Sequence, residues 1–152
     1  MRVALVVEYD GLNYYGFQYQ KNFVTIQEEI EKSIRQFTKE NLRVKAAGRT
    51  DAGVHATGQV VVFDTESDYE PYVITGALNA YLPEDIAVIE AYRVDRNFDP
   101  RRHALSRTYV YSIHNGDIHR PLSRKYTGLV KGSLDVDKMR RGAATFLGMH
   151  DF

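Results

Sequence analysis

The sequence predicts an α+β fold built on an antiparallel sheet, and three observations support this class. β-Branched runs typical of strands alternate with two segments whose apolar residues have helical spacing. Turn signals such as Asp10-Gly11 and Pro83 separate these segments. The 152 residues, 43% hydrophobic and 26% charged, are enough for an ordinary soluble domain with a hydrophobic core.

The first half of the predicted unit is a strand, a loop and a helix. Val3–Tyr9 has the apolar, β-branched character of a buried strand. A loop rich in aromatic residues and glutamine follows over residues 12–22. Thr25 and Glu28 have capping-box spacing, so a helix is expected to begin there and to end near Asn41. Its predicted apolar stripe is Ile26, Ile30, Ile34 and Phe37.

The second half of this unit adds two strands, a helix and a final strand. Alternation predicts strands over residues 42–46 and 58–64. A helix over residues 72–81 is expected to start at Pro71, and a last strand covers residues 86–94. The order β-α-β-β-α-β is the split βαβ, or ferredoxin-like, order. Two helices then cover one face of a four-stranded sheet, and the other face is free to meet a partner.

A second round of the same pattern begins near residue 105. Residues 108–113 alternate as a strand, and Asp135 is a plausible N-cap for a following helix. The apolar residues of that helix would be Val136, Met139, Ala143 and Phe146. A β-α half-unit cannot bury its own sheet. We therefore expect an N-terminal ferredoxin-like subdomain over residues 1–104, the incomplete start of a similar subdomain over 105–152, and a longer parent protein.

Composition excludes several classes of protein. The chain has no cysteine, which rules out disulfides, thiolate metal sites and cysteine nucleophiles. No apolar run approaches the roughly 20 residues of a membrane span. The N-terminus becomes acidic at Glu8, too early for a signal peptide, so we expect a cytoplasmic protein without membrane association. The five histidines lack metal-ligand spacing, and we expect no metal site.

Charge is unevenly distributed although the net charge is zero. Residues 1–92 contain 8 Lys/Arg against 14 Asp/Glu, whereas residues 93–131 contain 9 against 3. The basic stretch also includes Tyr109, Tyr111 and Tyr126. Basic residues interleaved with aromatics suit a polyanion with stackable bases, and a solvated basic face would have the same composition.

The segment GRTDAGVHA, Gly48–Ala56, is the most unusual loop of the chain. If its backbone is extended, Arg49 and Asp51 point to the same side, and the guanidinium would lower the pKa of the carboxyl group. An ionised carboxylate suits a nucleophile or a proton acceptor. An ion pair that only shapes the turn explains the spacing as well, and spacing alone favours it. His55 is expected to cap the loop by hydrogen bonding.

Two further segments have residues suited to nucleotides. The loop from Tyr9 to Gln20 holds aromatics and glutamines that would stack on bases and bond to them, or would simply fill the open end of the sheet. In the basic stretch, Arg107, Tyr109 and Tyr111 would share one strand face. A ring beside a guanidinium can sandwich a base, and it is equally an ordinary cross-strand packing pattern.

Taken together, these segments resemble the TruA family of tRNA pseudouridine synthases along the whole chain and in the family's order. The segment GRTDAGVHA is the most specific of them. The matching segments are Tyr9–Gly11, Tyr15–Gln20, Gly48–Ala56, Gly58–Val61, Asn79–Ile86, Arg107–Tyr111 and Leu147–Phe152. Two departures stand out: Phe17 replaces the tryptophan usual in the family, and family members continue well beyond residue 152.

The resemblance implies conversion of uridine to pseudouridine in the tRNA anticodon arm, without cofactor or metal, by a homodimer. It makes Asp51 the catalytic aspartate and Arg49 its partner. It makes Tyr109 the ring that stacks on the target uracil. The other substrate-binding residues it implies are Arg101, Arg107, His55, Gln18 and Gln20.

Other functions remain open on the sequence. A non-catalytic RNA-binding module would use the open sheet face, as RRM-type folds do. Such a binder has no need of a carboxylate facing a phosphate-rich ligand, so the Arg-x-Asp loop favours the enzyme. A structural or assembly domain would make the basic stretch and the aromatic loop incidental.

Overall fold

A computed structural model describes residues 1–151 of the chain. The chain forms two compact units, Met1–Arg107 and Thr108–Phe152. Phe152, the last residue of the segment Leu147–Phe152, lies outside the described residues. None of the helices within residues 1–151 has the length and hydropathy of a membrane span.

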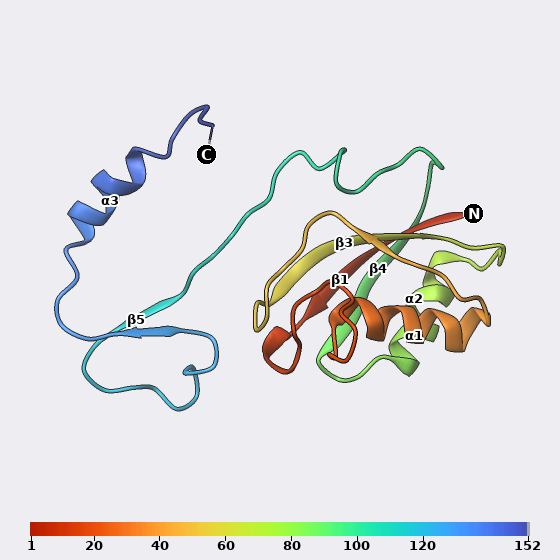
Figure 1. Cartoon of the computed structure of the whole chain (residues 1–152), viewed down its shortest axis with the longest axis horizontal. Coiled ribbons are helices and arrows are strands. Elements are labelled where there is room, and N and C mark those ends of the chain that lie inside the picture. Colours follow the sequence, from red (N-terminus) through yellow and green to blue (C-terminus); the bar gives the residue numbers. More distant parts are fainter. Residues whose placement is uncertain (152) are drawn as a thin grey trace. The chain divides into compact units, whose positions relative to one another are not determined.

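The first unit contains a four-stranded sheet with the strand order β2-β3-β1-β4 (Figure 1). Its strands are β1 (Arg2–Tyr9), β2 (Lys45–Ala46), β3 (Ala56–Asp64) and β4 (Ile86–Val94). Every neighbouring pair is antiparallel. With a helix between β1 and β2 and another between β3 and β4, this topology confirms the predicted split βαβ fold class.

Both helices of the first unit, α1 (Ile26–Thr38) and α2 (Pro71–Tyr81), pack on the same side of the sheet (Figure 1). Alternate residues of β1 point into this layer because successive strand side chains face opposite sides. The core joins residues of the strands and both helices, including Val3, Leu5, Val7, Val61, Ile30, Ile34 and Leu78. Burial of these side chains is the main stabilisation of the first unit.

Hydrogen bonds set the ends of α1 and of β2. The Glu28 amide donates to the Thr25 hydroxyl, so the helix begins as the capping signal predicts. It ends at Lys39 in a left-handed conformation (φ 63°), two residues before the predicted Asn41. β2 covers only the end of the predicted strand over 42–46, because the Val44 amide donates to the Glu31 carboxylate instead of a strand.

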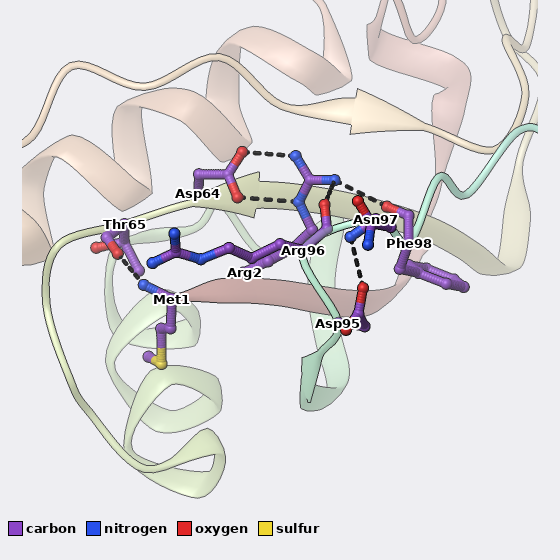
Figure 2. Close-up of polar contacts among 8 residues, drawn as sticks. All are labelled: Met1, Arg2, Asp64, Thr65, Asp95, Arg96, Asn97 and Phe98. Atoms are coloured by element: carbon purple, nitrogen blue, oxygen red, sulfur yellow. Dashed lines mark hydrogen bonds and ion pairs between the residues drawn. The ribbon is translucent and has the colours of Figure 1, made fainter.

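Arg2 at the start of β1 fixes the chain that leaves β4 (Figure 2). Its guanidinium makes a bidentate pair with Asp64, at 2.9 and 2.7 Å, and donates to the carbonyls of Arg96 and Phe98. The hydrogen bond with Arg2 lowers the pKa of the Asp64 carboxyl. These contacts of Arg2 anchor the beginning of the basic segment that contains Arg101.

The second unit is less regular. It contains β5 (Ile113–Asn115), paired in parallel with β6 (Gly128–Val130), and the helix α3 (Val136–Ala144). Asp135 caps α3 as predicted, by accepting from the Lys138 amide. The strand expected over 108–113 is wrong, because only Ile113–Asn115 finds a partner strand. Arg107, Tyr109 and Tyr111 therefore do not share a strand face. α3 also ends before Phe146.

Candidate active site

The loop that contains Asp51 connects β2 to β3 and is held by the aromatic loop that follows β1. The Phe17 amide donates to the Thr50 carbonyl at 3.0 Å, and the Gly53 amide donates to the Tyr14 carbonyl at 3.3 Å. These backbone bonds lie on either side of Asp51. They fix the loop without using its side chains.

Two glycines of the aromatic loop permit this close approach. A Cβ atom on Gly11 would lie 2.0 Å from the Val54 carbonyl oxygen, far inside van der Waals contact. A Cβ atom on Gly16 would lie 2.7 Å from the Thr50 carbonyl oxygen, and Gly16 also has a φ of +88°. The glycines of the segments Tyr9–Gly11 and Tyr15–Gln20 are thus needed for loop-on-loop packing.

Side-chain hydrogen bonds also join the Asp51 loop to the sheet. The hydroxyl groups of Thr50 and Tyr9 are 2.8 Å apart, and Tyr9 is buried. Burial raises the pKa of the Tyr9 phenol, and its hydrogen bonds offset only part of that effect. The Gln59 amide donates to the Gly48 carbonyl at 3.0 Å. The loop is therefore tied to the sheet on both sides of Arg49.

His55 links the end of the loop to the turn after β1. Its Nδ1 lies 3.2 Å from the Gly11 amide nitrogen and 3.0 Å from Asp10 Oδ1. A neutral ring can accept at Nδ1 from the Gly11 N–H, whereas a protonated ring donates from Nδ1 to Asp10. In either state His55 supports the loop that presents Asp51.

Asp51 and Arg49 are both exposed, and neither a hydrogen bond nor an ion pair within residues 1–151 joins their side chains. The expected Arg49–Asp51 pair is therefore wrong. Residues 49–51 lie outside the strands, between a bend at residues 47–48 and a turn at 52–53, so the strand alternation on which the pair rested does not hold there. Arg49 instead lines a groove beside the loop.

This groove, of about 830 Å³, runs along the β2 edge of the sheet and is rich in cations. Lys45, Arg49, Arg101 and Arg107 line it, and Asp99 is its only acidic lining residue among those described. Gln18 lines it as well, so the structure brings together four of the predicted site residues. Such a cleft attracts anionic ligands.

Arg107 joins the basic segment to the start of the Asp51 loop. Its guanidinium donates to the carbonyls of Ala47, at 2.9 Å, and Arg101, at 3.0 Å. Asp99 shapes the turn that contains Arg101, because its carboxylate accepts from the Arg101 and Arg102 amides. The backbone hydrogen bond from Arg102 lowers the pKa of Asp99. One long-range contact, to Ala47, and one local contact, to Arg101, thus place Arg107 in the groove wall.

Two predicted site residues lie elsewhere. The side-chain amide of Gln20 donates to the Tyr15 carbonyl at 2.7 Å, so it stabilises the turn of the aromatic loop. Tyr109 belongs to the second unit, where it is 76% exposed. Residues 1–151 contain no group of three or more His, Asp or Glu side chains placed to hold a metal ion.

Asp85 is a supporting residue that the sequence did not single out. It accepts from the Tyr14 hydroxyl at 2.8 Å and from the Asn13 amide at 3.1 Å, and so holds the aromatic loop that braces Thr50. Burial alone would raise the pKa of Asp85, but the hydrogen bonds from Tyr14 and Asn13 prevail and lower it. The motif Asn79–Ile86, in which it lies, was the only available signal.

Comparison with known proteins places this site in a family. The sequence model of a family described as tRNA pseudouridine synthase matches residues 5–101, which include the Asp51 loop and most of the groove. The chain belongs to this family. Beyond those residues, the similarity extends over nearly the whole chain in individual relatives.

Those relatives are proteins named tRNA pseudouridine synthase A. One from Geotalea daltonii is 42% identical over 150 residues, which are 99% of this chain and 62% of that protein. One from Acetivibrio thermocellus is 44% identical with the same coverage. One from Shewanella sediminis is 43% identical over 152 residues, or 58% of its length. The chain therefore spans about three fifths of the length of these relatives.

Proposed function

We propose that this chain contains the catalytic aspartate and part of the RNA-binding surface of a tRNA pseudouridine synthase. The observation that supports this most is the Asp51 loop. It lies in the part that matches the family, is fixed by backbone contacts on both sides, and borders a cationic groove. A fixed loop with an exposed carboxylate preorganises a reactive group.

The proposed reaction is an isomerisation of uridine that needs no added reactant. The N1–C1′ bond of the nucleoside breaks, the uracil turns, and a C5–C1′ bond forms. The C5 proton is lost and N1 gains a proton, so the atoms balance. Asp51 would attack C1′, attack C6, or remove the C2′ proton, and all three routes use its ionised carboxylate.

The other roles follow from position and residue type. Arg49, which lines the groove beside the loop, would contact the RNA near the target and occupy the space that a flipped base leaves. Arg101 and Arg107 would bind phosphates. Tyr109 is proposed to stack on the target uracil, and His55 to hold the loop. Gln18 would contact the substrate from the groove wall, and Gln20, whose amide holds the aromatic loop, would contribute from beside it.

The proposed substrate is the anticodon arm of tRNA, and the full-length protein is proposed to act as a homodimer in the cytoplasm. The cationic groove supports a polyanionic substrate, because neutralising phosphates with Lys and Arg releases counterions. The relatives' names specify tRNA as what those proteins modify.

Chemical mapping of pseudouridine in treated tRNA tests the reaction directly. The full-length protein should produce pseudouridine in the anticodon arm and nowhere in a tRNA from which that arm is removed. Bound but unmodified tRNA would instead support the non-catalytic RNA-binding module.

Salt titration tests the groove. Arg101→Gln with Arg107→Gln should weaken tRNA binding and make its dependence on salt shallower, because fewer counterions are released. The matched control is Arg35→Gln, an exposed arginine on α1 outside the groove. If the control and the double variant have the same salt slope as wild type, the RNA binds elsewhere.

A further inference from the structure

Two stacked side chains adjoin the groove, with the Arg43 guanidinium over the Tyr19 ring. The guanidinium carbon of Arg43 lies 4.7 Å from the centroid of the Tyr19 ring, within the range of a cation–π contact. Both groups are open to solvent, since Tyr19 is 41% exposed and the Arg43 side chain 65% exposed. We call this pair the Tyr19–Arg43 ledge.

A hydrogen-bond network fixes the ledge in place. Glu31 of α1, whose side chain is only 12% exposed, accepts from Arg43 Nη1 at 2.7 Å and from the Val44 amide at 3.1 Å. The amide of Gln27 donates to Glu31 at 2.8 Å, and its oxygen accepts from the Tyr19 backbone at 2.9 Å. A chain of four bonds therefore orders the two groups before any ligand arrives.

The ledge is continuous with the cationic groove. Gln18, directly before Tyr19, lines the groove, and so does Val44, directly after Arg43. Gln27, which bonds to Tyr19, lines it as well. An RNA strand whose phosphates lie along Lys45 and Arg49 would therefore meet the exposed Tyr19–Arg43 pair at the edge of the groove.

We propose that the Tyr19–Arg43 ledge is a stacking subsite for an unpaired base of the RNA whose phosphates occupy the groove. This rests on the proposed function, and it adds a contact for a base other than the reacting uridine. Aromatic rings stack on any base because every base has a π-face, and guanidinium planes stack in the same way. The subsite would contribute to affinity and leave the chemical step unchanged.

Fluorescence provides a direct test, because the chain contains no tryptophan. In Tyr19→Trp, binding of an anticodon stem-loop RNA or a single-stranded oligouridine should quench the indole as the complex saturates. The matched control is Tyr72→Trp on α2, at a tyrosine that is 77% exposed and outside the groove. That variant should bind the same RNA without quenching.

The outcomes separate the ledge from the proposed function. If Tyr19→Trp binds RNA in a filter assay but its indole fluorescence is not quenched, the stacking subsite alone is overturned. RNA that binds neither variant nor wild type would overturn the proposed function and the ledge with it.

Affinity provides a second, independent readout. Tyr19→Ala should raise the Kd for the stem-loop RNA about fivefold or more, while Tyr19→Phe should keep the wild-type value. The salt slope should not change in either variant, because no charge is lost. Arg43→Lys keeps the charge but loses the plane, and should also weaken binding. A wild-type Kd for Tyr19→Ala, with an unchanged melting temperature, would refute the subsite.

Discussion

The two units of the chain differ in how they bury apolar side chains. In the first unit, Val3 and Leu5 on the sheet and Ile30 on α1 are fully buried. In the second unit, α3 buries none of its residues, and Leu122 and Met149 are almost completely exposed. Because apolar burial drives folding, the first unit has the means to fold by itself and the described part of the second does not.

The difference matters for the candidate site. Asp51, Arg49 and the groove lie in the unit with its own core, and the contacts that fix the Asp51 loop all come from that unit. Tyr109 lies in the other unit. The carboxylate is thus presented by a self-sufficient framework, whereas the position of Tyr109 depends on what stabilises the second unit.

Separating the units should give the largest effect. A fragment of residues 1–107 should unfold in one cooperative transition, whereas a fragment of residues 108–152 should lack a cooperative transition altogether. Circular dichroism with heating measures both. A stable, cooperatively folding fragment 108–152 would break the comparison.

Replacing an apolar residue with alanine should cost several kcal/mol more of the free energy of unfolding on α1 than on α3. Ile30→Ala removes a fully buried side chain and should lower the free energy of unfolding by about 2–5 kcal/mol. Met139→Ala on α3, where the side chain is 46% exposed, should change it by about 0.5 kcal/mol or less. Urea unfolding measures the difference, and equal losses would contradict it.

Glycine-to-alanine substitutions should lower stability in the first unit and favour the helix α3 in the second. Gly11→Ala places a Cβ against the Val54 carbonyl and should destabilise the first unit by about 1–3 kcal/mol through forced backbone movement. Gly142→Ala on α3 meets no atom within 4 Å and should favour the helix by about 1 kcal/mol. Thermal melting monitors the first, and helical ellipticity the second. A neutral Gly11→Ala would show that the two loops do not pack as described.

The smallest effect should come from replacing Asp85, which should change how stability depends on pH in the acid range. Its pKa is lower in the folded protein than in the unfolded chain, so its contribution is complete above about pH 4 and is lost as pH falls through the folded value. Asp85→Asn should remove about 1 kcal/mol at neutral pH and make the acid-side fall in Tm shallower. Glu84→Gln, at an exposed neighbour, is the control. Parallel curves for Asp85→Asn and wild type would exclude this role.

Local signals predicted much of the first unit. The Thr25 cap, the succession of strands and helices along the chain and the limits of β4 all depend on residues close in sequence, and the structure confirms them. The strand over 108–113 failed because strand formation needs a partner, which alternation alone does not identify. The short β2 likewise reflects Glu31, an acceptor more than ten residues away.

The site was only partly predictable for the same reason. The sequence placed Asp51 in a loop between strands, but the contacts that brace it join the Asp51 loop to the aromatic loop some 40 residues earlier. The Arg49–Asp51 pair failed because residues 49–51 do not form a strand, so their spacing does not place both side chains on one side. Tyr19 and Arg43 are in direct contact, and Gln27 and Glu31 of α1 hold them there, an arrangement that no local pattern contains.

Asp51→Asn in the full-length protein tests the central claim most directly, because it replaces the carboxylate with a group of the same shape that cannot act as nucleophile or base. Pseudouridine formation, mapped in treated tRNA, should be abolished while the Kd for tRNA stays within about twofold. Pseudouridine formation at the wild-type rate, or an affinity loss that accounts for all of the lost activity, would contradict a catalytic role for Asp51.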